Sequence, residues 1–597
     1  MASITPAAAV SSIDPGGDGD DAVTGQLFVR HDGGSDDAIE ECNNAGTSTV
    51  PDTDATDGDT DNNDGGSRRQ GNEPFAVIDP TDPDTVVTGW NDYCQTDLGA
   101  GWQGFGYSRD GGETWVNSFV PGYPADSSAE GMQSPLHGNH TDAGDPIAAF
   151  DNSGRLFVGG ISFNRTNAIL GHVYVASYAA NDVVIPGPTA DYPVDYLRTR
   201  IVGVGTPSRN FFGIFQDKPM LEVDRTGGDT DGNVYVCWSR FTGLGVQNKI
   251  YFSRSTDHGN TFSSPIALTR HGFTGAVQGC DIAIEGDGDV YVTFRTFDDA
   301  SVVGENRLYF VRSTNGGASF GRPHKIVDFT PYNPFDGSRD CGDGTEACPS
   351  GFVFARTPLE PRVTADQNSA TNGVWLTYFA VDPATIEPSE TSYMSAGGGN
   401  VGRSVVYVVR STDNGGHWSG PVAVDPSPAD PGHQFFSDID ALNGTLAVMW
   451  QDSRSDPCYS VQLPMGNTED AESCGTNIVN TFVASSTNGG ATWSASLKVS
   501  DVAHQPQYEM FSNRSVPFQG DYNWISIVDT GAGLEAYTVW TDNRNVVEGT
   551  DPRESVQDGF DVWQCRVETS PGVWSSDRCA NAGGVNQDIF GNRVALP

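Results

Sequence analysis

The chain has 597 residues, of which 78 are acidic and 33 basic, so its formal net charge at pH 7 is -45. A field of this sign repels nucleic acid and anionic membrane surfaces, and neither is expected as a partner. No run of about eighteen apolar residues occurs, so no membrane insertion is expected. The 72 glycines and 35 prolines, together with 10% aromatic residues, indicate a β-rich core with many turns.

Residues 1–70 form an acidic segment rich in Gly, Asp, Ser and Thr. The first ten residues lack a basic region and a long apolar region, so we interpret them as a mature N-terminus with an added methionine, and we expect a secreted or cell-surface protein. Calcium is the one candidate cofactor, and no organic cofactor is expected. A calcium loop and a flexible acidic linker explain the alternating carboxylates of this segment equally well. These carboxylates are Asp57, Asp59, Asp61 and Asp64.

An octapeptide of the form Ser-x-Asp/Asn-x-Gly-x-x-aromatic occurs five times. Its copies are SRDGGETW (108–115), STDHGNTF (255–262), STNGGASF (313–320), STDNGGHW (411–418) and STNGGATW (486–493). Each copy follows a short apolar run, which is typical of a strand. The Asp or Asn accepts hydrogen bonds within a turn, and the glycine permits a positive φ, so each copy predicts a β-hairpin turn. Five copies in one register amount to an internal repeat.

A longer unit surrounds these turns from residue 72 onward. Seven such units, each with four expected strands, predict an all-β, seven-bladed β-propeller over residues 71–570. Six blades are the alternative, because the second unit, which begins at Asp145, has no octapeptide. The last unit also lacks one, and we expect its third strand at residues 561–564. A strand at Leu27–Arg30 is the candidate for closing the ring, and residues 571–597 are expected to pack on the propeller as a C-terminal extension.

The octapeptides resemble the Asp-box (BNR) repeat of sialidases and other Asp-box β-propellers. The resemblance implies that the boxes lie on the face opposite the ligand site. The ligand face would then carry the starts of the first strands and the ends of the second strands. The starts of the first strands supply Glu73, Asp145, Asp217, Lys218, Asp281, Arg362, Asp438, Asp440, Asp521 and Tyr522. Crowded polar groups shift one another's pKa values, as acid–base chemistry or metal binding requires.

The same resemblance assigns roles to some of these residues. Tyr522 stands at the place of the sialidase nucleophile, Asp281 is nearest to the glutamate that activates it, and Asp92 is placed as the proton donor. Arg295 and Arg362 stand at two places of the arginine triad that grips a carboxylate. Glu73 occupies the place of the first arginine, which is a departure from the sialidase pattern.

Two further residues are candidates on this face. Asp145 begins the second unit, and His140 lies in the loop before it. We expect both to bind substrate, together with Glu73, Arg295 and Arg362. The repeated Trp-x-Asp-x-Arg segments at 450–454 and 540–544 have a structural interpretation instead, as a clasp between blades.

Ten cysteines without metal-ligand spacing indicate disulfides and an oxidising compartment. Three pairs are close in sequence, and the remaining four cysteines are paired by elimination, although sequence alone leaves the connectivity open. The pairs are Cys341 with Cys348, Cys458 with Cys474, Cys565 with Cys579, Cys42 with Cys94, and Cys237 with Cys280.

These features predict a secreted propeller that acts on a carbohydrate or glycoconjugate. A sialidase-like exo-glycoside hydrolase with altered specificity is the first hypothesis. A non-catalytic glycan- or protein-binding propeller, located at the cell surface and holding structural calcium, is the alternative. A polysaccharide lyase with His140 as its base is the third. The oligomeric state does not follow from the sequence.

Overall fold

The computed structural model describes most of the chain from Arg68 onward and one short N-terminal strand. The described residues are 28–30, 68–93, 101–112, 115–124, 126, 128–164, 171–179, 196–206, 213–242, 247–269, 276–297, 306–332, 361–368, 373–390, 393–426, 431–462, 478–511, 516–544, 546–550, 560–563, 567–571, 573–574 and 585–597. The expected calcium loop at Asp57–Asp64 lies outside this part of the chain, as do Cys42, Cys94, Cys341, Cys348, Cys474, Cys565 and Cys579.

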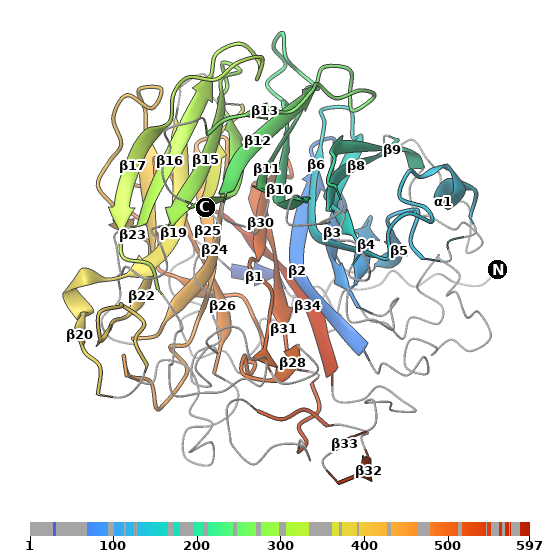
Figure 1. The fold of residues 1–597 in the computed structure, drawn as a ribbon. Helices are drawn as coiled ribbons and strands as arrows, with labels where there is room; N and C mark the ends of the chain where they lie inside the picture. The colour runs from blue at the N-terminus through green and yellow to red at the C-terminus, as the bar shows by residue number, and fades with distance from the viewer. Residues whose placement is uncertain are drawn as a thin grey trace, which may run out of the picture.

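Seven four-stranded antiparallel units form a ring, so the expectation of a seven-bladed propeller is confirmed (Figure 1). Blade 1 consists of β2 (Arg68–Asp79), β3 (Asp82–Asp92), β4 (Trp102–Ser108) and β5 (Val116–Phe119). Blade 2 consists of β6 (Asp142–Phe150), β7 (Leu156–Phe163), β8 (His172–Tyr178) and β9 (Tyr196–Gly203). Blade 3 consists of β10 (Ile214–Val223), β11 (Val234–Thr242), β12 (Gln247–Ser255) and β13 (Ile266–Ala267). The second unit is therefore a true blade, although it has no octapeptide.

The remaining blades repeat this order from the inner to the outer strand. Blade 4 consists of β14 (Ala276–Ile284), β15 (Val290–Phe297), β16 (Asn306–Ser313) and β17 (His324–Phe329). Blade 5 consists of β18 (Arg362–Ala365), β19 (Val374–Val381), β22 (Ser404–Ser411) and β23 (Val422–Ala423). Blade 6 consists of β24 (Gln434–Leu442), β25 (Thr445–Asp452), β26 (Asn480–Ser486) and β27 (Leu497–Lys498). Blade 7 consists of β30 (Trp524–Asp529), β31 (Leu534–Asp542), β34 (Val585–Ala595) and β1 (Phe28–Arg30).

Short elements decorate the connections between the blade strands. They are α1 (Ala129–Gln133), the 3-10 helix η2 (Pro383–Thr385), and the paired strands β20 (Glu387–Pro388) with β21 (Asn400–Val401), β28 (Glu509–Phe511) with β29 (Val516–Pro517), and β32 (Glu568–Ser570) with β33 (Val573–Trp574). No helix among the described residues is both long and apolar enough to cross a membrane.

Blade 7 closes the ring with strands from both ends of the chain. The expected strand at Leu27–Arg30 is present as β1, which pairs with β34 as the outermost strand. Residues 588–595 of β34 pair with β31, and residues 585–587 run parallel to the start of β2 in blade 1, which Figure 1 shows as red beside blue. The expectation of a third strand at residues 561–564 is wrong, because β34 takes that place and Val562 only bridges Glu548. The propeller therefore extends past residue 570 to Ala595.

Buried tryptophans occupy one register position on the second strands of four blades. Trp90, Trp238, Trp450 and Trp540 are each at most 2% exposed, and each buries a large apolar area between sheets. A buried indole N–H requires an acceptor, and in three of these blades the acceptor is the aspartate two residues further along the chain. Trp90 Nε1 donates to Asp92, Trp450 Nε1 to Asp452 and Trp540 Nε1 to Asp542, over 3.1, 3.2 and 2.9 Å. Arg454 and Arg544 pair with the last two carboxylates at 2.6 and 2.8 Å, which supports the structural interpretation of the Trp-x-Asp-x-Arg segments.

The five octapeptides form the turns between the third and fourth strands of blades 1, 3, 4, 5 and 6. In every copy the serine hydroxyl accepts the backbone N–H of the fifth residue at 2.8–2.9 Å, and that residue, a glycine, has a φ between 72° and 99°. Gly111 N of the first box donates to Asp84 O near the start of β3. The boxes therefore lie at the ends of the inner strands, opposite the face on which those strands begin.

A disulfide joins two neighbouring blades. Cys237 on β11 bonds to Cys280 on β14, 43 residues later, and both are fully buried in the core between blades 3 and 4. This pair was expected from the sequence by elimination. Cys458 is also disulfide-bonded, to a cysteine outside the described residues.

Removing the Cys237–Cys280 cross-link should destabilise the propeller. We expect the double variant Cys237→Ala/Cys280→Ala to lose about 2–5 kcal/mol of unfolding free energy, because the cross-link restricts the unfolded chain. Thermal unfolding followed by circular dichroism measures the loss. Reductant should lower the melting temperature of this variant less than that of the wild type, and an equal effect on both proteins would contradict the prediction.

Candidate active site

The inner strands begin at the open mouth of the ring with a β-bulge. The pairing register shifts between Asn72 and Phe75, between Gly144 and Ile147, and between Asp217 and Met220, with equivalent shifts in blades 4 and 6. A bulge adds one residue to a strand and redirects its side chain, and bulges are frequent beside active sites.

Three of these bulges hold a charged residue in the left-handed region. Glu73, Asp145 and Lys218 have φ values of 56°, 53° and 49°, and each precedes a proline. A side chain disfavours this conformation, and each such residue costs on the order of 1–3 kcal/mol. Strained backbone of this kind persists only where the surrounding structure holds it, and it is frequent at active sites and ligand-binding sites.

The three strained residues and Asp521 of blade 7 meet at one ammonium group. Lys218 Nζ lies 2.5 Å from Asp521 Oδ2, 3.3 Å from Asp145 Oδ1 and 3.5 Å from Glu73 Oε1. All four side chains are at most 10% exposed. Blades 1, 2, 3 and 7 are thereby joined at the axis through one cation.

Amide groups fix the orientation of the carboxylates. Asn91 Nδ2 donates to Glu73 Oε2 at 2.8 Å, and Asn91 Oδ1 accepts the backbone N–H of Asp145 at 3.0 Å. Asp145 Oδ2 in turn accepts the backbone N–H of Lys218 at 2.9 Å. On the other side of the cluster, Gln278 Nε2 donates to Asp217 Oδ2 at 3.2 Å.

The excess of carboxylates over cations shifts their protonation. Burial, followed by the negative charge of Asp145, raises the pKa of Asp217 to about 7. Burial raises the pKa of Glu73 well above its ordinary value, although Lys218 opposes that shift. Asp217 is part-exposed as a residue, whereas Glu73 is only 3% exposed and the side chain of Asp521 only 2%. The cluster therefore includes one carboxyl group, that of Asp217, which is partly protonated at neutral pH.

A second layer of residues closes the axis below this cluster. Arg362 Nε pairs with Asp438 Oδ1 at 3.0 Å, and its guanidinium lies 4.1 Å from the ring centre of Trp524 and 5.4 Å from that of Tyr522. Lys218 Nζ is 5.6 Å from the same Tyr522 ring. Tyr522 Oη donates to the backbone carbonyl of Pro146 at 3.3 Å.

Four of the residues singled out in the sequence therefore share the axis: Glu73, Asp145, Arg362 and Tyr522. Asp281 adjoins them, because its Oδ2 accepts the backbone N–H of Val363, next to Arg362, at 2.7 Å. Burial raises the pKa of Asp281 to about 7, although Arg362 opposes that shift.

Three other predicted residues have different surroundings. Arg295 donates to Asn306 Oδ1 at 2.9 Å and lies over Phe329, so its neighbours are on β16 and β17, the outer strands of blade 4. Asp92 accepts the Trp90 indole, the structural role that Asp452 and Asp542 also have. His140 is buried against His172 with ring centres 4.7 Å apart, and burial lowers its pKa to about 4, so the ring is neutral. The chemical roles predicted for these residues stay predictions.

The sequence included Lys218, Asp217 and Asp521 in the ring of strand starts but gave them no role. The signal was available, because the three segments Asn72-Glu73-Pro74, Gly144-Asp145-Pro146 and Asp217-Lys218-Pro219 share one pattern. Gln278 carried no sequence signal, because only the bulge in β14 directs it to Asp217.

Comparisons with known proteins find structural similarity alone. No family model and no curated protein matches the chain. An α-L-arabinofuranosidase from Fusarium graminearum, in complex with an iminosugar inhibitor, is 14% identical over 64% of this chain and 88% of its own, with a TM-score of 0.35. The Trypanosoma rangeli sialidase in complex with the inhibitor DANA is 12% identical over 65% and 53%, with a TM-score of 0.35. The phage phi92 endosialidase is 11% identical over 89% and 68%, with a TM-score of 0.42.

The raised pKa of Asp217 predicts a pH dependence of stability. Because its pKa is about 7 in the folded chain and about 4 in the unfolded chain, the folded state binds more protons between these values. The free energy of unfolding should therefore fall as the pH rises from 5 to 7.5. In Asp217→Asn this fall should be smaller, as measured by urea unfolding at both pH values. The exposed control Asp229→Asn should match the wild type, and an unchanged slope in Asp217→Asn would contradict the prediction.

Proposed function

We propose that this propeller acts on carbohydrate as a glycoside hydrolase, with Asp217 as proton donor and Asp521 as the ionised carboxylate opposite it. The observation that carries the proposal is the convergence of three carboxylates, Glu73, Asp145 and Asp521, on Lys218, beside Asp217, whose pKa is raised to about 7. Glycoside hydrolysis requires such a pair, one carboxyl group protonated and the other ionised.

Asp217 and Asp521 belong to one cluster, because the negative charge of Asp521 contributes to the raised pKa of Asp217. Asp521 is the nucleophile in this proposal because its carboxylate pairs with the Lys218 ammonium at 2.5 Å, and Asp217 is the donor because its pKa is raised to about 7 and the residue is part-exposed.

The charge at the mouth favours a neutral sugar over sialic acid. Three carboxylates contact one lysine, and the nearby guanidinium of Arg362 is already paired with Asp438. A substrate carboxylate would meet repulsion here, whereas a sialidase grips it with three arginines. Neutral hydroxyl groups can instead donate to the carboxylates and accept from Gln278. We therefore propose altered specificity, for neutral glycosides.

Substrates with different leaving groups distinguish the proton donor, Asp217, from the nucleophile, Asp521. Asp217→Asn should slow hydrolysis of an unactivated neutral disaccharide about 10²- to 10⁴-fold, because its leaving alkoxide needs a proton. The same variant should retain most of its activity on a 2,4-dinitrophenyl glycoside, whose leaving group needs none. Asp521→Asn should lose activity on both substrates, as measured by product release across a panel of neutral aryl glycosides.

Asp229→Asn, which removes an exposed carboxylate in the β10–β11 turn, is the matched control and should leave both rates unchanged. Equal losses on the two substrates in Asp217→Asn would remove Asp217 as the donor. Sialoside cleavage faster than cleavage of every neutral glycoside would reject the neutral specificity.

Tyr522→Phe tests the nucleophile that the resemblance to sialidases implies. Under the carboxylate mechanism, the hydroxyl that this variant removes takes no part in bond cleavage and donates to the Pro146 carbonyl, so its kcat/KM should stay within about tenfold of the wild-type value. The same panel of glycosides measures it. A loss of about 10³-fold or more would support Tyr522 as nucleophile and overturn Asp521.

A non-catalytic, carbohydrate-binding propeller is the second candidate, and the depth of the cluster favours it. Glu73, Asp145 and Lys218 are only 3–7% exposed, as expected for a purely structural ionic junction between blades. Absence of release from the whole panel, with binding retained on a glycan array, would establish this alternative. We also propose export from the cell, which the buried Cys237–Cys280 disulfide supports.

A further inference from the structure

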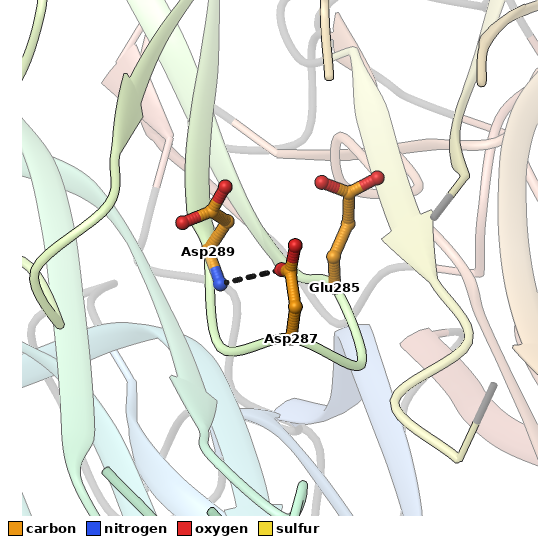
Figure 2. Close-up of side chains that lie close together, drawn as sticks. All are labelled: Glu285, Asp287 and Asp289. Atoms are coloured by element: carbon orange, nitrogen blue, oxygen red, sulfur yellow. Dashed lines mark hydrogen bonds between the residues drawn. The ribbon is translucent and has the colours of Figure 1, made fainter. Parts of the chain in front are cut away.

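The turn between β14 and β15 carries three carboxylates in alternate positions. The sequence Glu285-Gly286-Asp287-Gly288-Asp289 lies at the end of β14, on the box face of blade 4. Figure 2 shows the three side chains gathered along one side of this turn. One oxygen of each carboxylate lies within 4.8 Å of the others, a spacing that one metal ion can span.

In equivalent turns of other blades, one oxygen of the first carboxylate accepts a backbone N–H of the turn, although Asp224 Oδ2 in blade 3 has no hydrogen-bond partner among the described residues. Asp79 accepts the backbone N–H of Thr81 at 2.7 Å, and Asp151 accepts that of Ser153 at 2.9 Å. Blade 4 has Glu285 at this position, whose longer side chain does not close the same turn. Its Oε2 instead accepts the hydroxyl of Tyr291 at 2.7 Å.

The other oxygen of Glu285 is unpaired beside two further carboxylates, and this combination carries the inference. Oε1 is buried without a hydrogen-bond partner among the described residues, and Glu285 as a whole is only 1% exposed. An unpaired buried carboxylate oxygen is costly unless a cation coordinates it. The neighbouring Asp287 is exposed, so the site has access to solvent.

The local charge suits a divalent ion. Arg312, which donates to Asp289 Oδ2, is the cation paired with this turn, so three carboxylates and one guanidinium leave two negative charges. The available ligands are all hard oxygens on a glycine-containing turn, which is the donor type that calcium prefers.

We propose that Glu285, Asp287 and Asp289 bind one calcium ion on the box face of blade 4. The ion lies beside Arg312, whose Nη1 reaches the Asn414 carbonyl in the box of blade 5 at 3.5 Å. Calcium therefore stabilises the junction of these two blades. It takes no part in chemistry at the mouth, which lies at the opposite ends of the inner strands.

Calcium binding to the chelator-treated full-length chain tests this site. Isothermal titration should give about one equivalent more for the wild type than for Glu285→Gln. Asp287→Asn should weaken the same site about tenfold or more, because it removes a charged ligand. Calcium should also raise the melting temperature of the wild type more than that of either variant, and magnesium titrated in parallel should bind more weakly.

Asp229→Asn is the matched control, because it removes an exposed carboxylate from the corresponding turn of blade 3. It should bind as many calcium equivalents as the wild type. If Glu285→Gln does not fold, the exposed Asp287→Asn decides the outcome. Unchanged stoichiometry and affinity in Asp287→Asn, or tighter binding of magnesium than of calcium, would overturn the proposal. Any calcium bound elsewhere in the chain would remain in all variants and would not obscure the difference.

Discussion

Every site in this protein depends on the closure of the ring. A single blade buries neither face of its sheet, so each blade is stable only between two neighbours. The pairing of β34 with β31, β1 and the start of β2 supplies the last contact, and it joins residues from both ends of the chain. Gln587 on β34 continues this seam, because it accepts from Asn72 and donates to Asn543. The mouth of the ring is therefore assembled only when the two ends meet.

Closure of the ring brings together charged side chains that are hundreds of residues apart in the sequence. Glu73 and Lys218 are 145 residues apart, and Asp521 is still further along, yet all three reach one ammonium group. Burial makes each carboxylate costly to ionise, and the single lysine compensates for only part of that cost. The result is a cluster with both protonated and ionised carboxyl groups at neutral pH. Acid–base chemistry requires that combination.

Carboxylates have different surroundings on the two faces of the propeller. At the mouth, bulges redirect charged side chains toward the axis and toward one another. On the box face, most carboxylates bond to their own turns, and Asp413, for example, accepts the backbone N–H of His417 at 2.7 Å. The turn at Glu285 departs from this pattern, because three carboxylates lie close together there and Glu285 Oε1 lacks a hydrogen-bond partner among the described residues. The excess of carboxylates over cations therefore produces a buried ionic cluster at one end of the inner strands and a candidate calcium site at the other end.

The sequence by itself determined the fold, because five octapeptides in one register and seven strand units repeat a local pattern that each blade satisfies independently. It also placed Glu73, Asp145, Arg362 and Tyr522 on one face, since strand starts in a propeller share an edge. Only the tertiary structure decided that β34 replaces residues 561–564 in blade 7, since a pairing over such a distance leaves no local signal. It alone decided which charges meet, because the bulges aim Lys218 at Glu73, Asp145 and Asp521, whereas Arg295 packs against Asn306 in the outer part of its blade.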